Sequence, residues 1–250
     1  MANDIYIKRL HVVDSTNRYI RDEADALWNV GGGNDMVAVV ASHQTTGRGQ
    51  RGNVWASEKG CNLLLSVLLR PGTSLEVSNQ FLLSQTVAVA IHSAMKRHGI
   101  DTMVKWPNAI YVGNRKLAGI LVELDYSGSF IEQAIVGIGL NVNQSKFPEM
   151  DRVPVSMKML LGRELSVDDV LSEILDTFNN FYRKMKIDGE EIAVMYNELL
   201  LGLGEQRKFI DANGCFTAVL VEVESDGHLL LKCADGTQKR YAFKEVEMVL

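Results

Sequence analysis

The sequence predicts an α+β fold, with helices packed on a mixed β-sheet, followed by a small all-β domain. Up to about residue 203, apolar runs of the length of buried strands alternate with segments at helical spacing. Residues 204–250 change to short strands separated by Asn-Gly and Asp-Gly pairs, which are typical of hairpin turns. A chain of 250 residues is also long enough for one large domain and a small one. We therefore expect domains at residues 1–203 and 204–250.

The first elements are strands and one helix. Residues 5–13 predict a strand, and a helix over 15–28 is expected to begin at its first three residues, whose hydroxyl and amide groups suit an N-cap. The glycine-rich residues 31–35 predict a break. Residues 36–42 and 62–69 are nearly continuous apolar runs. Such runs are typical of strands that are buried on both faces.

The middle of the chain predicts one helix and four strands. Apolar residues recur at helical spacing over 78–98, and basic residues followed by glycine end that segment. Short strands are expected at 103–105 and 110–112. Residues 116–124 and 130–142 predict antiparallel neighbours, because a Ser-Gly-Ser turn joins them.

The last part predicts two helices and then the β domain. A Ser-Val-Asp-Asp variant of the capping box begins a helix over 166–185, and a second helix is expected over 190–201. Hairpin turns are expected at residues 213–214, 226–227 and 235–236. The β domain is therefore expected to resemble a barrel.

Composition excludes several classes of protein. The net charge of −5 argues against a general nucleic-acid binder, so any positive patch must be local. The three cysteines, Cys61, Cys215 and Cys233, are an odd number without C-x-x-C spacing, which favours neither disulfides nor a zinc site. No segment approaches the roughly 18 apolar residues of a membrane span. We expect a cytoplasmic protein.

Residues 47–52 form the sequence Gly-Arg-Gly-Gln-Arg-Gly, which matches the G-x-G-x-x-G pattern of dinucleotide-binding turns. That function requires a helix after the glycines and an acidic residue about twenty positions later. Residues 53–60 have no apolar helical face, and the acid nearest to the position twenty residues later is Glu76. Glycines and arginines together favour an anion-binding loop. A solvated surface turn is the alternative.

Five motifs in chain order resemble those of biotin–protein ligases over roughly residues 10–145. They are Ser15-Thr16-Asn17, Gln44 with the loop 47–52 and Trp55, Lys105-Trp106-Pro107-Asn108, Lys116-Leu117-Ala118-Gly119-Ile120-Leu121, and Gly137-Ile138-Gly139-Leu140-Asn141. The resemblance implies a class II synthetase-like catalytic domain and an SH3-like C-terminal barrel. It also implies an enzyme that joins biotin to ATP as biotinyl-5′-AMP and passes the biotinyl group to a lysine of a biotin carboxyl carrier protein domain.

The resemblance implies a role for each matching residue, and it makes Arg48 and Lys116 catalytic cations. The residues implied to bind biotin are Ser15, Thr16, Asn17, Gln44, Gly47, Arg48, Lys116 and Gly119. Those implied to bind the nucleotide are Arg48, Gly49, Arg51, Trp55, Lys105, Asn108 and Asn141. Mg²⁺ is expected with ATP, and the sequence names no ligands for it. A homodimer is compatible with the resemblance.

Two positions depart from the family pattern. Gln50 stands where many members have another arginine, and Ala109 follows Asn108 where aspartate is usual. Either another acid such as Glu123 replaces that aspartate, or a step of the reaction is impaired; an engineered substitution is a third explanation. A catalytically impaired biotin-binding protein is therefore one alternative for function. The other is a lipoate or octanoate ligase or transferase, which shares the general architecture.

Only 14 residues precede Ser15, so we expect no DNA binding.

Overall fold

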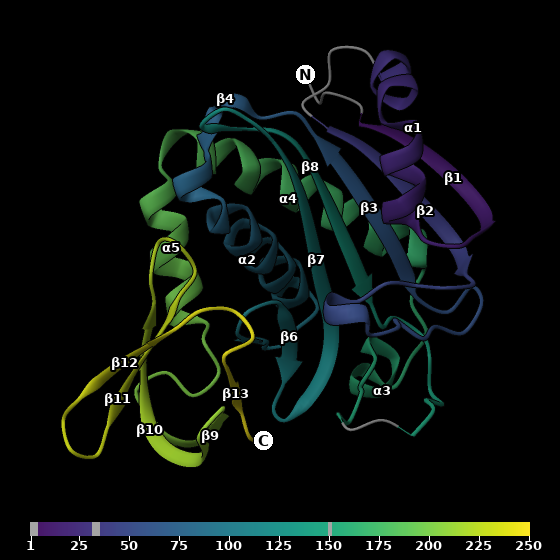
Figure 1. The fold of residues 1–250 in the computed structure, drawn as a ribbon. Coiled ribbons are helices and arrows are strands. Elements are labelled where there is room, and N and C mark those ends of the chain that lie inside the picture. The colour runs from purple at the N-terminus through teal and green to yellow at the C-terminus, as the bar shows by residue number, and fades with distance from the viewer. Residues whose placement is uncertain (1–4, 32–35, 150–151) are drawn as a thin grey trace.

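The computed structural model describes residues 5–31, 36–149 and 152–250, and of Arg51 it describes the main chain alone. The larger part is built on a mixed eight-stranded sheet (Figure 1). Its strands are β1 (Tyr6–Val13), β2 (Met36–Gln44), β3 (Leu63–Leu69), β4 (Gly72–Glu76), β5 (Met103–Lys105), β6 (Ala109–Val112), β7 (Arg115–Ser127) and β8 (Phe130–Leu140). The order is β1-β2-β3-β8-β7-β6-β5, and β4 pairs with β8. The expected mixed sheet is thus confirmed.

Helices cover both faces of this sheet. They are α1 (Thr16–Gly31), α2 (Phe81–Arg97), α3 (Met157–Leu161), α4 (Val167–Ile187) and α5 (Gly189–Glu198). Helix α1 packs on β2, β3 and β8, whereas α2 and α4 pack together under the other face (Figure 1). Two short 3₁₀ turns, η1 (Gln50–Gly52) and η2 (Val77–Asn79), lie in the connections.

The continuous apolar run of β2 follows from this double covering. Val37 and Val39 pack with α1, while Met36, Ala38 and Val40 belong to the main core on the other side. Successive side chains of a strand point to opposite faces. A strand covered on both faces therefore needs apolar residues at every position.

The predicted strands and helices of the large domain are all present, with shifted ends. β7 and β8 pair in antiparallel fashion, as expected. Strand β4 and helix α3 were not predicted. In β4 the buried Leu75 is the one apolar side chain among exposed polar ones, so the sequence gives almost no strand signal there. The predicted break at 31–35 lies, apart from Gly31 at the end of α1, outside the described residues.

The C-terminal strands form a second, antiparallel sheet in the order β12-β11-β10-β9-β13. They are β9 (Gln206–Asp211), β10 (Gly214–Val223), β11 (Leu229–Cys233), β12 (Gln238–Tyr241) and β13 (Val246–Met248). All three predicted hairpin turns are confirmed. Gly214, Gly227 and Gly236 have φ of 115°, 93° and 86°, values that other residues rarely adopt. The barrel-like closure of this sheet stays a prediction.

The small sheet is attached to the large domain by apolar and polar contacts. Phe209 and Leu220 belong to the same buried cluster as α2 and α5. Trp106 Nε1 donates to the carbonyl of Gly227 at 3.0 Å, and Asn197 makes two hydrogen bonds with the main chain of Val223. Because the core is continuous, the boundary at 203–204 stays a prediction.

Candidate active site

Three glycines of the central strands form the floor of a cavity. Gly119 of β7 faces Gly139 of β8, and Gly137 lies between Ser66 of β3 and Leu121 of β7. A Cβ at Gly137 would come within 2.4 Å of Asn17 Oδ1, and one at Gly139 within 2.4 Å of the Trp55 ring. Tight packing is therefore the reason for these glycines, because neighbouring side chains occupy the space above them.

The polar wall of this cavity is the start of α1. Because β1 and β2 are parallel, their carboxyl ends meet, with Val13 opposite Gln44. The chain turns from β1 into α1 there, so Thr16 meets Gln44. The Thr16 amide and hydroxyl both donate to Gln44 Oε1, at 2.7 and 3.0 Å. Ser66 Oγ lies 2.6 Å from both Thr16 Oγ1 and Asn17 Oδ1.

Ser66 was not predicted as a site residue. It is fully buried, and it links Thr16 and Asn17 to the middle of β3. A buried hydroxyl needs partners, and those partners are two side chains predicted to bind biotin. Its sequence signal is a single serine inside the apolar run Leu-Leu-Leu-Ser-Val-Leu-Leu. That signal indicates a buried polar contact and does not say with what.

Glu123 of β7 lies well away from Ala109 of β6. Asn17 Nδ2 donates to it at 2.8 Å, and Arg48 lies 3.3 Å away. In the sheet, Ala109 is opposite Gly119, four residues before Glu123 along the strand, or about 13 Å. The suggestion that Glu123 replaces an aspartate at position 109 is therefore not supported.

The glycine-arginine loop is a small hairpin that closes over the cavity. Arg48 and Val54 form a β-bridge, the amide of Gly49 donates to the carbonyl of Asn53 at 2.7 Å, and η1 is its tip. A Cβ at Gly47 would lie 2.5 Å from the carbonyl oxygen of Trp55. The glycine is thus required for the two sides of the hairpin to approach. The next regular element after η1 is strand β3, and not the helix that a dinucleotide-binding turn requires. The sequence predicted this.

Trp55 lies against the glycine floor. A Cβ at Gly119 would be 3.0 Å from its ring, and Lys116 Nζ is 5.1 Å from the ring centroid, within the range of a cation–π contact. Its Nε1 is buried without a hydrogen-bond partner among the described residues. The cavity therefore offers a donor that an acceptor group of a ligand could satisfy.

Lys116 enters the cavity at an irregularity in the sheet. The register between β6 and β7 shifts between Ile110 and Tyr111, so that Tyr111 pairs with Lys116; such bulges redirect side chains. Burial, followed by the charges of Arg152 and Lys105, lowers the pKa of Lys116 to about 8. No carboxylate of a described residue lies within ion-pair distance of its Nζ. A buried cation without a counter-ion is suited to an anionic ligand.

A second cavity adjoins the first on the side of the small sheet. We call the first the polar cavity and the second the cation cavity. Lys116, Asn108, Gly49, Gln50 and Trp55 line both. The cation cavity is further lined by residues from distant segments, namely Lys105, Trp106, Pro107, Ala109, Arg152, Phe243, Val246, Glu247 and Met248.

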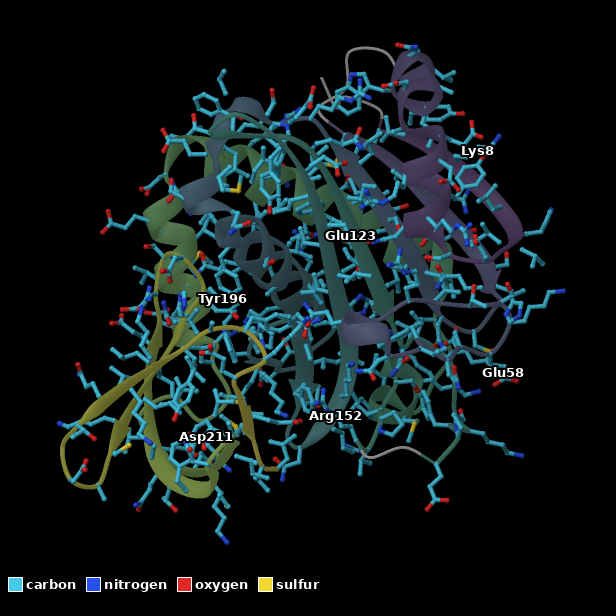
Figure 2. All side chains as sticks on the ribbon, viewed as in Figure 1. Lys8, Glu58, Glu123, Arg152, Tyr196 and Asp211 are labelled. Atoms are coloured by element: carbon cyan, nitrogen blue, oxygen red, sulfur yellow. The ribbon has the colours of Figure 1, made fainter. Side chains whose placement is uncertain are left out.

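Arg152 and Glu247 were not predicted. Glu247 of β13 lies 2.6 Å from Arg152 and 3.6 Å from Lys105. Figure 2 shows Arg152 near the lower end of the large sheet, on the side of the small one, and Glu123 farther up. Arg152 stands in a long connection without a motif, so the sequence carries no signal for it.

The structure brings most of the predicted site residues together. Those lining the polar cavity are Ser15, Thr16, Asn17, Gln44, Arg48, Gly49, Trp55, Asn108, Lys116 and Gly119. Lys105 lines only the cation cavity. Gly47 lies in the hairpin beside Gln44, and the side chain of Arg51 is outside the described ones.

Asn141 is buried behind Lys116. Its Nδ2 donates to the carbonyls of Val155 and Lys116, at 3.1 and 3.4 Å. It lines a side cavity with Arg152 and Trp55 and neither of the two described above. Its amide thus holds the segment after Arg152 against β7, and its predicted contact with the nucleotide stays a prediction.

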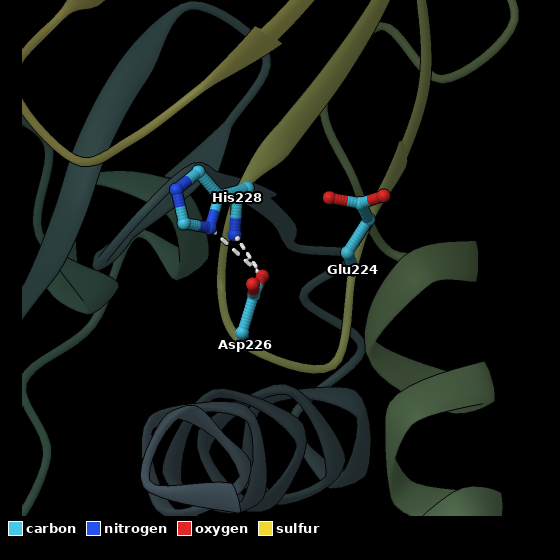
Figure 3. Close-up of side chains that lie close together, drawn as sticks. All are labelled: Glu224, Asp226 and His228. Atoms are coloured by element: carbon cyan, nitrogen blue, oxygen red, sulfur yellow. Dashed lines mark hydrogen bonds and ion pairs between the residues drawn. The ribbon is translucent and has the colours of Figure 1, made fainter. Parts of the chain in front are cut away.

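The described residues offer few free side-chain ligands for a metal ion. Glu224, Asp226 and His228 lie together on the turn between β10 and β11 (Figure 3). Arg240 pairs with both carboxylates, so part of their negative charge is already compensated and their oxygens are engaged. In the cation cavity the one carboxylate is Glu247, which two cations hold, and Ala109 offers no ligand. These residues do not fit a resident magnesium ion.

Comparison with known proteins identifies the family. The model of the biotin/lipoate A/B protein ligase family matches residues 10–141, which is the region that contains the predicted motifs. The chain belongs to this family. No helix among the described residues is both long and apolar enough to cross a bilayer.

The similar proteins include ligases with biotin in their names. The chain is 33% identical over 208 residues to the bifunctional ligase/repressor BirA of Bacillus subtilis, covering 82% of this chain and 64% of that protein. It is 29% identical to the biotin–[acetyl-CoA-carboxylase] ligase of Paracoccus denitrificans, and the match covers 70% of this chain and 72% of that protein. A solved structure of the Aquifex aeolicus biotin protein ligase with biotin and ATP matches at a TM-score of 0.80, with 29% identity and 98% of both chains covered.

Proposed function

We propose that this chain joins biotin and ATP to form biotinyl-5′-AMP and then transfers the biotinyl group to a lysine of a biotin carboxyl carrier protein domain. One observation carries the proposal: Lys116 lines both the polar cavity and the cation cavity. The polar cavity has hydroxyl and amide groups that suit the ureido ring of biotin. The cation cavity has the charges that suit a triphosphate. Lys116 stands where the two reacting groups would meet.

The chemistry requires what Lys116 supplies. In the first step an oxygen of the biotin carboxylate attacks the α-phosphorus of ATP, a new O–P bond forms, and pyrophosphate leaves. This step brings two anions together, so a preorganised cation lowers its barrier. In the second step the neutral ε-amine of the acceptor lysine attacks the acyl carbon, and AMP leaves. Neither step requires a covalent bond to this chain.

The hairpin over the cavity fits the intermediate. An acyl phosphate reacts with water, and a loop that covers it limits that side reaction. Arg48 reaches into the polar cavity and is paired with Glu123. We propose that Arg48 contributes charge to the adenylate from this position, together with Lys116. Because the cation cavity does not fit a resident metal ion, the magnesium would arrive as the MgATP complex.

The lipoate alternative is less well supported than biotin, although the family contains both kinds of ligase. The solved structure matched along 98% of this chain is of a biotin protein ligase with biotin and ATP. Biotin-dependent exchange between ATP and labelled pyrophosphate tests the proposal. Exchange with lipoate or octanoate and none with biotin would contradict it. Biotin binding by calorimetry without any exchange would favour the impaired, biotin-holding protein.

Ala109 is the position to vary next in that assay. It is buried and in register with Lys105, so Ala109→Asp would place a carboxylate beside the cation cavity. We expect Ala109→Asp to lower several-fold the Mg²⁺ concentration that gives half-maximal exchange, because a carboxylate helps to hold the metal–phosphate complex. Ala109→Asn is the control of matched size. Equal effects of the two substitutions would show that charge at this position is not limiting.

Further parts of the proposal concern partners and location. The net charge of −5 supports our proposal that this chain does not bind DNA, and a mobility shift with operator DNA would contradict it. We also propose a cytoplasmic location, since the three cysteines are free. A homodimer remains a proposal that analytical ultracentrifugation of the purified chain tests directly.

A further inference from the structure

The cation cavity contains a carboxylate held between two cations. Glu247 Oε1 lies 2.6 Å from Arg152 and 3.6 Å from Lys105. The three residues come from different parts of the chain: Lys105 from β5, Arg152 from the connection after β8, and Glu247 from β13 in the small sheet. A single carboxylate oxygen thus faces both an ammonium and a guanidinium group, as a phosphate oxygen does in nucleotide sites.

The charges of this cavity do not balance without a further anion. Lys105, Lys116 and Arg152 line it, and Glu247 is the one carboxylate among the described lining residues. Burial lowers the pKa of Lys105, the charge of Arg152 lowers it further, and Glu247 opposes both. Glu247 pairs with Lys105 and Arg152 only, and Lys116 has no such partner among the described residues, which leaves an excess of positive charge for a polyphosphate.

Glu247 is ionised and is also able to leave. Burial opposes its ionisation, but the hydrogen bond from Arg152 and the charge of Lys105 hold its pKa below the ordinary value. Its side chain is 53% exposed, and β13 is an edge strand that pairs with β9 alone. Because an exposed ion pair contributes little to stability, another anion can replace the Glu247 carboxylate at small cost.

Arg152, by contrast, is anchored next to Lys116. The segment that follows it pairs with the start of β7, with the Lys116 amide donating to the carbonyl of Val153 at 2.8 Å and the Val155 amide donating to that of Lys116 at 2.9 Å. The main chain next to Arg152 is therefore held beside the cavity whether or not Glu247 stays in contact.

We propose that Arg152 is a further phosphate-binding residue of the nucleotide site and that Glu247 holds the phosphate position until the nucleotide displaces it. This inference rests on the proposed use of ATP. When the triphosphate enters, Lys105 and Arg152 exchange a carboxylate oxygen for phosphate oxygens, and Glu247 turns to solvent. The small sheet thereby competes with the nucleotide for the same two cations.

If phosphate replaces the Glu247 carboxylate, substitutions of Arg152 and Glu247 should change the affinity for MgATP in opposite directions. Arg152→Gln removes a charge-assisted bond to phosphate, so it should raise the dissociation constant for MgATP about tenfold or more. Glu247→Gln removes the internal competitor, so it should lower that constant several-fold, by the reciprocal of the fraction of time that the site is open. Neither substitution should change the affinity for biotin, because neither residue lines the polar cavity.

Calorimetric titration of the full chain with MgATP, and separately with biotin, tests the inference. Arg97→Gln and Glu222→Gln are matched controls, since both residues are exposed and outside the two cavities, and Glu222 belongs to the same small sheet. Arg152→Lys keeps the charge and should lose less affinity than Arg152→Gln. Unchanged biotin binding shows that a variant is folded.

The outcomes separate the inference from the proposed function. Unchanged MgATP affinity in Arg152→Gln would overturn the role of Arg152. Weaker MgATP binding in Glu247→Gln would overturn the competition and indicate instead that Glu247 positions Arg152 or helps to hold the metal. Opposite shifts in the two variants support the inference even when the wild-type chain shows no biotin-dependent exchange, which would count against the proposed function alone. Absence of MgATP binding to the wild-type chain overturns both.

Discussion

The polar cavity and the cation cavity meet at Lys116, and they are built by opposite means. Around the polar cavity the side chains are mostly neutral and already bonded to one another, as in the contacts of Thr16 with Gln44 and of Ser66 with Asn17. Around the cation cavity three side chains, Lys105, Lys116 and Arg152, carry positive charge, and Glu247 reduces the repulsion between two of them. Neutral groups can be preorganised at little cost, whereas a cluster of cations is stable only with a counter-ion.

The largest expected effect is on the residue that the two cavities share. Lys116→Ala should lower kcat/KM for biotin-dependent pyrophosphate exchange by about a hundred- to a thousandfold, because it removes the charge that stabilises the developing transition state. Steady-state kinetics measure the loss. Lys116→Arg should retain part of the activity. An alanine variant that is folded and keeps near wild-type exchange would show that the charge of Lys116 does not stabilise the transition state.

The next effect should be confined to the polar cavity. Ser66→Ala removes the hydroxyl that contacts Thr16 Oγ1 and Asn17 Oδ1, and the loss of a buried partner typically costs about 1–3 kcal/mol in the free energy of unfolding. The same loss loosens the start of α1, so we expect weaker biotin binding and an unchanged dissociation constant for MgATP. Urea denaturation and calorimetry measure both. Equal losses for the two ligands would mean that the cavities are not independent.

The pH dependence should report the cation cavity. The pKa of Lys116 is about 8 because burial, Arg152 and Lys105 lower it, so the lysine is charged below that pH and neutral above it. Anionic substrates favour the charged form. We therefore expect kcat/KM to be nearly constant below pH 8 and to fall about tenfold per pH unit well above it, as for loss of one proton.

Arginine at the same position provides the control for that profile. Since arginine stays charged throughout this range, Lys116→Arg should remove the decline near pH 8, whatever its absolute activity. A decline at the same pH in both proteins would assign the ionisation to another group.

The smallest expected effect concerns the attachment of the small sheet. Trp106→Phe removes the hydrogen bond to the carbonyl of Gly227 and keeps most of the ring, so unfolding should be easier by about 0.5–1.5 kcal/mol. Thermal denaturation measures this change. Because Trp106 also lines the cation cavity, MgATP affinity should shift more than biotin affinity. The reverse order would contradict the assignment of this residue to the cation cavity.

The two cavities also differ in how far the sequence predicts them. Ser15, Thr16, Asn17 and Gln44 follow strands that are recognisable as apolar runs, and the parallel pairing of β1 with β2 brings them together. The resemblance to biotin–protein ligases grouped them as one predicted site, whereas the strand pairing came from the structure alone. Ser66 gave a weaker signal, since a serine within an apolar run indicates burial but not its partners.

Arg152 and Glu247 could not be predicted. They meet only because the small sheet packs against the large one, and contacts between segments 95 residues apart have no local pattern. The same reason explains why Glu123 was a poor suggestion for the carboxylate missing at Ala109. Sequence reasoning identified an acidic residue near a motif, while the register of β6 and β7 places the two positions at different ends of the site.

By itself the sequence determined most of the strands and helices in their order, the hairpin turns of the small sheet, and the resemblance that proved to be the family. These follow from local periodicity, turn chemistry and motifs, which act over a few residues. The tertiary structure decided that the glycines of β8 make room for Asn17 and Trp55, and that the loop at residues 47–52 belongs to a hairpin over a cavity. It also decided which acid faces the cations, because long-range electrostatics depends on packing between segments that the sequence does not bring together.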